Sequence, residues 1–267
     1  MQTVEIRLDG TLARLSASYY EGRPQVSDAE YDRLEAAAKP KRLYGSHRRY
    51  TVTHPGPVLS LKKVFLHELP RFLKRSTRWT VEPKVDGGAC VLTYRGGELV
   101  KAATRGDGEK GGDITRQMMK APHIPKKING NKDLDIVGEL YCPSGEFQKF
   151  SGYADSRCLA CGVMHLSAPA GDPRYSAVRF VAHGVFSGDY SSTVDSLKAH
   201  GFEVLPRLVS SSPVALTRWA KSQWKNRARL PYAIDGIVFK ADRDADRKTL
   251  GNGKRFPFWA CAVKVFE

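Results

Sequence analysis

Three lysines lie inside or at the end of apolar, strand-like segments of the sequence, and such a set favours a site that handles phosphate. Lys84 ends a short strand-like run, Lys240 closes the run Ile234–Phe239, and Lys264 lies within Ala262–Val265. An ammonium group in such a place is costly unless it faces an anion. Close cations also depress one another's pKa, which would free one amine to act as a nucleophile near neutral pH.

Acidic residues and one further cation accompany these lysines at the ends of strand-like segments. They are Glu82, Asp86, Arg105, Glu139 and Asp235. A lysine between two acids is by itself more typical of a surface ion pair. Taken together, the residues predict a basic pocket for a phosphate group, with one nucleophilic lysine and with acids that bind a metal ion or a ribose.

Two further motifs are weaker alternatives. Gly106–Gly111 has the form G-x-G-x-x-G, but the helix expected after it reaches only to Pro122 and no parallel strand is evident, so a glycine-rich turn is the better interpretation. Cys158 and Cys161 form a single C-x-x-C, and a structural zinc site would need about four ligands. We expect both to be ordinary reduced thiols.

Strands with glycine-rich turns and interspersed helices must position these residues. Strands are expected at Thr80–Pro83, Ala89–Tyr94, Leu99–Thr104, Asp135–Tyr141, Arg179–Val185, Ile234–Ala241 and Trp259–Phe266. Helices are expected at Asp113–Lys120, Ser144–Phe150, Thr193–His200 and Pro213–Lys225. Arg95–Glu98 has the composition of a hairpin turn. Antiparallel hairpins mixed with helices predict an α+β fold rather than an alternating parallel sheet.

The N-terminal region has a helical pattern of its own. Leu8, Leu12, Leu15 and Tyr19 form one apolar stripe, and Ser27–Glu30 has the form of a capping box that opens a second helix. A basic, irregular stretch follows. The sequence thus predicts a small helical domain with its linker over residues 1–53 and a larger domain over residues 54–267.

Composition narrows the class of partner. The chain has 267 residues and a formal net charge of +15, which points to a polyanion and most often to nucleic acid. No apolar run reaches the roughly 18 residues that a membrane-spanning helix needs, and the N-terminus does not resemble a signal peptide. Five scattered cysteines suit a reducing compartment, so a cytoplasmic protein with no membrane partner is expected.

The order of the motifs resembles one family. K-x-D-G at Lys84–Gly87 resembles the first signature of the covalent nucleotidyltransferases. Segments similar to those of the bacterial-type NAD-dependent DNA ligases follow in the order of that family: Glu82–Gly87, Ala102–Gly108, Val137–Glu139, Ile234–Lys240 and Trp259–Lys264. Val58–Leu61 and Val26–Asp32 are also similar. The resemblance implies an ATP-grasp-like nucleotidyltransferase domain with mixed and antiparallel sheets, preceded by a small helical domain.

The resemblance also implies roles. Lys84 would take AMP from NAD and release nicotinamide mononucleotide, the first step of sealing nicks in duplex DNA. Glu82, Ser60, Leu61 and Gly87 would line the nucleotide pocket, Arg105 and Glu139 would hold the ribose, and Lys240 and Lys264 would bind the phosphate. Asp235 and Glu139 are the expected Mg²⁺ ligands, and Asp86 belongs to the catalytic set. Asp28, Tyr31 and Asp32 would contact the nicotinamide mononucleotide half.

The sequence departs from the family pattern at identifiable points. His183 occupies a position where the family usually has tyrosine, and it could still stack on adenine; Arg157 matches a family arginine. The OB-fold and helix-hairpin-helix domains typical of the family do not follow Lys264. The chain would then be part of a longer enzyme, a minimal enzyme, or one subunit of a split enzyme whose second chain carries those domains. An ATP-dependent or RNA-sealing ligase and a non-catalytic, basic nucleic-acid-binding subunit are the alternatives.

Overall fold

Two five-stranded sheets form the framework of the protein in a computed structural model, which describes residues 15, 25–26, 51–186 and 188–264. The first, called the β3 sheet, has the order β10 (Leu208–Ser210), β3 (Trp79–Val85), β11 (Ile234–Ala241), β12 (Ala260–Val263) and β2 (Lys62–Lys63). The second, called the β4 sheet, has the order β5 (Glu98–Thr104), β4 (Gly88–Arg95), β7 (Leu134–Tyr141), β8 (Arg179–Val185) and β9 (Glu203–Val204).

Antiparallel pairing dominates both sheets. Parallel pairing occurs only where β2 joins β12 and where β9 joins β8, among the strands that the structure describes. A small separate pair joins β1 (Val52–Thr53) to β6 (Lys110–Gly111). The α+β class with mixed sheets is therefore confirmed, and the sheet pairing excludes an alternating parallel arrangement.

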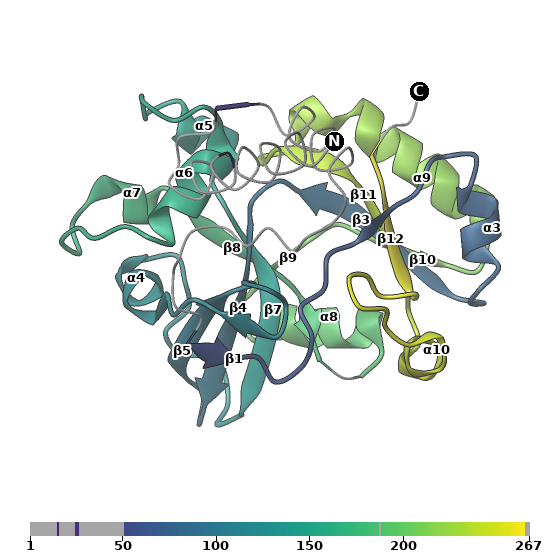
Figure 1. Ribbon diagram of the computed structural model, residues 1–267, viewed down its shortest axis with the longest axis horizontal. Helices are drawn as coiled ribbons and strands as arrows, with labels where there is room; N and C mark the ends of the chain where they lie inside the picture. The colour runs from purple at the N-terminus through teal and green to yellow at the C-terminus, as the bar shows by residue number, and fades with distance from the viewer. Residues whose placement is uncertain (1–14, 16–24, 27–50, 187, 265–267) are drawn as a thin grey trace, which may run out of the picture.

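Helices cover the two sheets separately (Figure 1). α4 (Thr115–Lys120), α5 (Ser144–Phe147), α6 (Ser156–Val163) and α7 (Pro173–Ser176) gather on the side of the β4 sheet, whereas α3 (Leu69–Leu73), α9 (Pro213–Lys225) and α10 (Asp244–Leu250) lie on the side of the β3 sheet. α8 (Tyr190–Ala199) packs against β8 and β9, and the short 3₁₀ helix η1 (Arg227–Arg229) follows α9.

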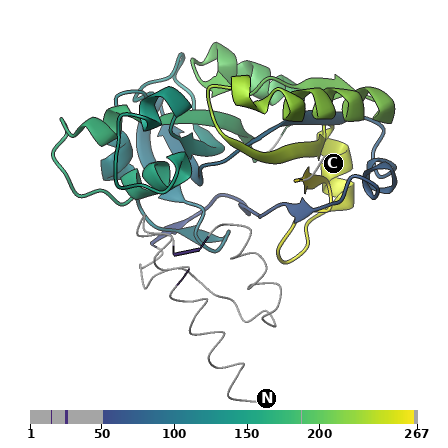
Figure 2. The ribbon, with the colours of Figure 1, turned by 90° about the horizontal axis from the view of Figure 1, so that it is seen from above.

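The core is divided in the same way. One apolar cluster fills the space between the β4 sheet and its helices, with Leu92, Ile136 and Leu159 fully buried. A second lies between the β3 sheet and α9, which runs along that sheet in Figure 2. α9 begins where the Ser212 side chain accepts a hydrogen bond from the Ala215 amide, an N-cap that satisfies an otherwise unpaired donor. A smaller third cluster takes residues from both sheets and joins them.

The chain passes directly from one sheet to the other at the K-x-D-G motif. β3 ends at Val85, β4 begins at Gly88, and only Asp86 and Gly87 lie between. A Cβ atom at Gly87 would lie 2.3 Å from the Leu140 carbonyl oxygen, so only glycine permits this close passage over β7.

Most predicted elements are present, with shifted ends. The expected hairpin turn is confirmed between β4 and β5, where Gly96 and Gly97 both have positive φ. The glycine-rich turn is confirmed at Gly106–Gly111, where Asp107 accepts two backbone amides. α3, α6, α7 and α10 were not expected. No helix in the part of the chain that the structure describes is both long and apolar enough to cross a membrane.

Candidate active site between the two sheets

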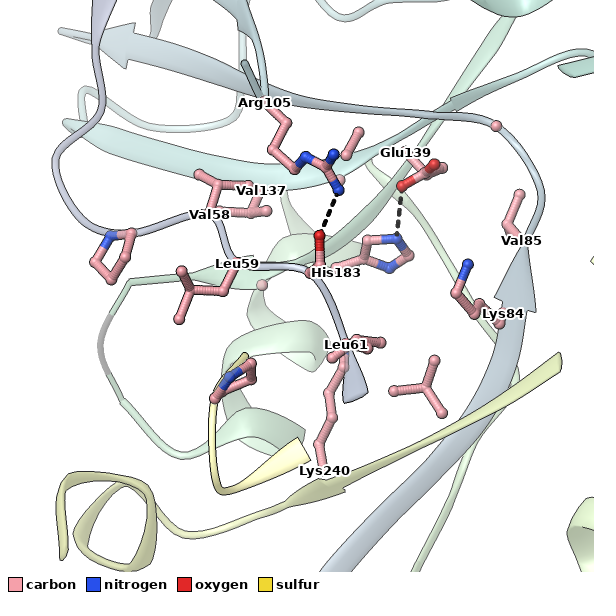
Figure 3. A pocket seen from close by; sticks show the side chains of 18 of the residues that line it. Val58, Leu59, Leu61, Lys84, Val85, Arg105, Val137, Glu139, His183 and Lys240 are labelled. Atoms are coloured by element: carbon pink, nitrogen blue, oxygen red, sulfur yellow. Dashed lines mark hydrogen bonds and ion pairs between the residues drawn. The ribbon is translucent and has the colours of Figure 1, made fainter. Parts of the chain in front are cut away.

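A cavity of about 580 Å³ opens between the two sheets, beside a small apolar cluster that joins them. The segment 57–61, strands from both sheets and α10 line it. Among the predicted site residues that the structure describes, the cavity gathers Ser60, Leu61, Glu82, Lys84, Asp86, Gly87, Arg105, Glu139, Arg157, His183 and Lys240. Figure 3 shows Lys84, Arg105, Glu139, His183 and Lys240 entering it from different elements. The other two, Asp235 and Lys264, join the site through Lys84.

The first cluster, called the outer cluster, is a row of two lysines and one acid. Asp235 Oδ1 lies 2.8 Å from Lys84 Nζ, and Asp235 Oδ2 lies 2.8 Å from Lys264 Nζ. The side chains of Lys84, Asp235 and Lys264 are 28%, 17% and 29% exposed. The cluster thus carries one positive charge more than negative charge and remains accessible to an incoming anion.

A β-bulge builds the outer cluster. β11 pairs with β3 in regular register except between Ile234 and Gly236, so Asp235 is an extra residue opposite the end of β3. A Cβ atom at Gly236 would lie 2.7 Å from the Val263 carbonyl oxygen, and glycine therefore lets β12 approach. The pair Asp-Gly in β11 thus places the Asp235 carboxylate between Lys84 of β3 and Lys264, which directly follows β12.

Electrostatics in the outer cluster corrects one expectation from the sequence. Burial lowers the pKa of Lys84, but the carboxylates of Asp235 and then Glu139 outweigh it, and the pKa of Lys84 stands above its ordinary value. Burial likewise raises the pKa of Asp235, but Lys84 and Lys264 hold it below the usual range. The expected depression of the Lys84 pKa by neighbouring cations was therefore wrong for this state, because Asp235 separates the two ammonium groups.

The second cluster, called the inner cluster, is an acid, a lysine and a tyrosine. Lys240 Nζ lies 2.6 Å from Glu82 Oε1 and donates to the Tyr190 hydroxyl oxygen at 2.8 Å, and that hydroxyl donates to Glu82 Oε2 at 2.7 Å. Glu82 is 2% exposed and Lys240 is 8% exposed. Burial opposes the charge on both, and it lowers the pKa of Lys240; the ammonium of Lys240 and nearby His183 nevertheless hold the pKa of Glu82 below its usual range.

Lys240 therefore lies with Glu82 and not with the outer lysines. Glu82 is opposite Val238 in the β3–β11 ladder, so Lys240 is its diagonal neighbour on the same face. The sequence resemblance groups Lys240 with Lys264 as phosphate-binding residues. The structure assigns the two lysines to different clusters.

Polar residues from the β4 sheet complete the wall (Figure 3). His183 Nε2 lies 3.8 Å from Glu139 Oε2, and His183 Nδ1 lies 4.0 Å from Glu82 Oε1. Arg105 donates to the Ser60 hydroxyl at 2.9 Å and accepts, through its carbonyl oxygen, a hydrogen bond from His54 Nε2 at 3.1 Å. His183 thus lies between an acid of each sheet.

The aspartate of the K-x-D-G motif pairs with a helix that the sequence did not reveal. Arg157 donates to Asp86 at 3.1 Å from the first turn of α6, whose N-cap Asp155 accepts the Cys158 amide. Cys158 and Cys161 lie in this helix, and all five cysteines are free and buried, as expected. Burial is the largest cause that raises the pKa of Cys161, to about 12, so this thiol is no nucleophile at neutral pH.

Most of the small helical domain predicted over residues 1–53 lies outside the described residues. Asp28, Tyr31 and Asp32 lie outside the described residues. No cluster of three or more acidic, histidine or cysteine side chains suitable for a metal ion occurs in residues 51–186 and 188–264. Tyr190, which was not predicted, lines the cavity and belongs to no sequence motif; its position just before the expected helix Thr193–His200 was the only available signal.

Comparisons with known proteins agree on one family. Residues 47–267 match the model of the NAD-dependent DNA ligase adenylation domain. A DNA ligase of Rhizorhabdus wittichii is 32% identical over 316 residues, which cover 96% of this chain and 44% of the relative. A DNA ligase of Stenotrophomonas maltophilia is 33% identical over 95% of this chain and 36% of its own length. The chain thus spans less than half of these relatives.

A solved structure from a structure-function study of Lig E DNA ligases is also similar. It covers 81% of this chain and 70% of its own, with 19% identity and a TM-score of 0.46.

Proposed function

The chain belongs to the family of NAD-dependent DNA ligases, and on that basis we propose that it transfers AMP from NAD to its own Lys84 as the first step of sealing nicked duplex DNA. The observation that carries this proposal is the outer cluster. It offers a primary amine on an open face of the cavity, beside a second ammonium and one carboxylate. Those are the groups that covalent nucleotidyl transfer needs.

The transfer balances as a substitution at phosphorus. Lys84 Nζ, after losing one proton, forms a P–N bond with the adenylate phosphorus of NAD. The P–O bond to nicotinamide mononucleotide breaks, and that group leaves with the electron pair. Lys264 and, from across the cavity, Arg157 would offset the negative charge on the phosphoryl oxygens. The raised pKa of Lys84 makes removal of its proton part of the barrier.

The rest of the cavity fits the nucleoside. The inner cluster would meet the edge of adenine, with Glu82 as acceptor and Lys240 as donor, and His183 would stack on the base. Arg105, fixed by Ser60, and Glu139 would hold the ribose. In this assignment Lys240 contacts the base, whereas the sequence had suggested the phosphate, because its partner in the structure is Glu82.

Mg²⁺ is typical of the family, and the residues fit an ion that arrives with the substrate. Asp235 already bridges two lysines, so the described residues offer no closed set of carboxylates. Mg²⁺ commonly keeps several waters and binds one or two carboxylates together with substrate phosphates. Glu139 and Asp235 would supply those carboxylates, and the ion would offset charge on the phosphoryl group.

Intact-protein mass after incubation with Mg²⁺ and either NAD or ATP tests the proposal. We expect a gain of one AMP from NAD, no gain from ATP, and no gain in Lys84→Arg. Arginine keeps a cation beside Asp235 but is no nucleophile under these conditions, so this variant separates chemistry from charge. A covalent adenylate in Lys84→Arg would overturn the assignment of Lys84. Transfer from ATP alone would move the protein to the ATP-dependent branch.

Nicked duplex DNA is the proposed acceptor of the AMP group. The net charge of +15 supports binding to phosphate backbones, which weakens steeply as salt rises. We expect the affinity for a nicked duplex, measured by fluorescence anisotropy, to fall at least about tenfold between 50 and 200 mM salt. A second chain with OB-fold and helix-hairpin-helix domains stays a predicted partner; efficient sealing by this chain alone would make it unnecessary.

A further inference from the structure

The hydroxyl of Tyr190 connects the acid and the base of the inner cluster. It donates to Glu82 Oε2 at 2.7 Å and accepts from Lys240 Nζ at 2.8 Å, and its ring lies under that ammonium, 4.2 Å from Nζ to the centroid. Tyr190 is buried and lines the cavity. This side chain belongs to no sequence motif, and the proposed transfer does not itself require it.

The direction of each hydrogen bond follows from the groups themselves. An ammonium group only donates, so the oxygen of Tyr190 must accept from Lys240 and its proton must point to Glu82. Glu82 therefore receives one donor on each carboxylate oxygen and, as an ionised acid, can only accept further hydrogen bonds. Lys240 has two of its three N–H groups engaged and one left for a ligand.

This arrangement is complementary to a base edge that pairs a hydrogen-bond donor with an acceptor. A base must offer an amino group to Glu82 beside a ring nitrogen that accepts from Lys240, as the Watson–Crick edge of a 6-aminopurine does. A 6-oxopurine such as hypoxanthine offers an oxygen to the carboxylate and an N–H to the ammonium. Both contacts would then be mismatched, and a mismatched buried polar pair is strongly rejected.

The position of Tyr190 is fixed by the opposite sheet. The Tyr190 amide donates to the Asp242 carbonyl at 2.8 Å, and the amide and hydroxyl of Ser191 donate to the Asp242 carboxylate at 2.9 and 3.0 Å. Thr80 of β3 donates to the same carboxylate at 2.8 Å. α8 packs on the β4 sheet, but these hydrogen bonds attach its first turn to the β3 sheet, where Glu82 and Lys240 lie.

We propose that Tyr190 is a positioning residue that sets base selectivity: it holds Glu82 as an acceptor and occupies one N–H of Lys240, so that the cavity takes a 6-aminopurine and rejects a 6-oxopurine. This inference rests on the proposed function. In Tyr190→Phe the carboxylate can rotate and Lys240 regains a free donor, which can then pair with a 6-oxo group. Selectivity should fall more than affinity for adenine.

Two measurements on the full chain test the role. The first is the rate of nucleotidyl transfer to Lys84 from NAD and from nicotinamide hypoxanthine dinucleotide. The second is calorimetric binding of AMP and of IMP, which needs no chemistry at Lys84. We expect wild type to prefer the amino form in both, and Tyr190→Phe to lose about tenfold or more of that preference.

Tyr141→Phe is the matched control. Tyr141 donates to Glu203 Oε1 at 2.6 Å, a tyrosine–glutamate hydrogen bond of the same kind, and neither residue lines the cavity. This variant should keep the wild-type preference for the amino form. Its thermal stability should fall about as much as that of Tyr190→Phe. Tyr190→Gln, whose amide can both donate and accept, should recover part of the preference, and it decides the question if Tyr190→Phe does not fold.

The outcomes separate the two proposals. If neither dinucleotide transfers its nucleotide to Lys84, the proposed function is wrong. The ratio of the affinities for AMP and IMP would still test the role of Tyr190. An unchanged ratio in Tyr190→Phe, an equal change in Tyr141→Phe, or a wild type that binds IMP as well as AMP would overturn the role of Tyr190.

Discussion

The inner and outer clusters arise from the same strands but differ in depth and in charge. Glu82 and Lys84 are two residues apart in β3, so their side chains emerge on one face of the sheet. The inner cluster joins one acid to one lysine and is buried. The outer cluster joins one acid to two lysines and is partly exposed. One strand thus contributes to a buried cluster of balanced charge and to a more accessible, positively charged one.

The difference explains why the two clusters suit different tasks. Hydrogen bonds that discriminate between bases must be fixed and shielded from water, since water would satisfy a mismatched group. A group that exchanges a proton and a phosphoryl substituent must instead be reached by substrate and be able to change partners. The outer cluster has two ammonium groups that can face a phosphate, whereas the inner cluster pairs its one lysine with an acid.

The largest expected contrast is in stability. Glu82→Ala leaves the buried ammonium of Lys240 without its carboxylate, and we expect the free energy of unfolding to fall by about 3–5 kcal/mol. Asp235→Ala leaves two lysines that can move toward solvent, and about 1 kcal/mol is expected. Urea unfolding of the two variants measures both values. Equal losses of unfolding free energy in the two variants would contradict the distinction between a buried and an accessible cluster.

A smaller effect concerns phosphate. Lys264→Met removes one of the two ammonium groups of the outer cluster, so we expect AMP to bind about tenfold more weakly, which is about 1.4 kcal/mol. Adenosine, which lacks the phosphate, should bind as it does to wild type. Titration calorimetry with both ligands separates the clusters in a single variant.

Lys62→Met is the control for that experiment. Lys62 is exposed on β2, the strand beside β12, and its loss removes the same charge without touching Asp235. A tenfold loss of AMP affinity in Lys62→Met would show that general surface charge, rather than the outer cluster, attracts the phosphate.

The sequence predicted elements better than it predicted partners. Apolar runs and glycine turns indicated β3, β4, β5, β7, β8 and β11 nearly at their observed bounds, because burial and turn chemistry are local properties. α6 was not predicted because its start signal, Asp155 at the N-cap, is a residue type that is also common in loops.

Partners depend on register and on tertiary approach, which a single sequence does not show. The pairing of Lys240 with Glu82 could not be predicted, because their diagonal relation is set by the β3–β11 register. The sequence suggested that Lys84 and Lys264 repel each other, but the bulge places the Asp235 carboxylate between them. Tyr190 lines the cavity because hydrogen bonds to Asp242 hold the first turn of α8 against the β3 sheet.

The smallest expected effect is a shift in the titration of Lys84. Asp235 is the largest cause that raises the pKa of Lys84, against burial, so Asp235→Asn should lower that pKa. A raised pKa keeps the amine protonated, and therefore unreactive, to higher pH; in the variant the free amine should appear at lower pH. Acetic anhydride labelling of Lys84 in the substrate-free protein, read by peptide mass spectrometry across pH, measures the midpoint. The labelling of Lys62, which is exposed on β2 two strands away from β11, serves as the internal reference. A Lys84 midpoint that stays in place would mean that Asp235 does not control the amine, and the outer cluster would then differ from the inner one in exposure alone.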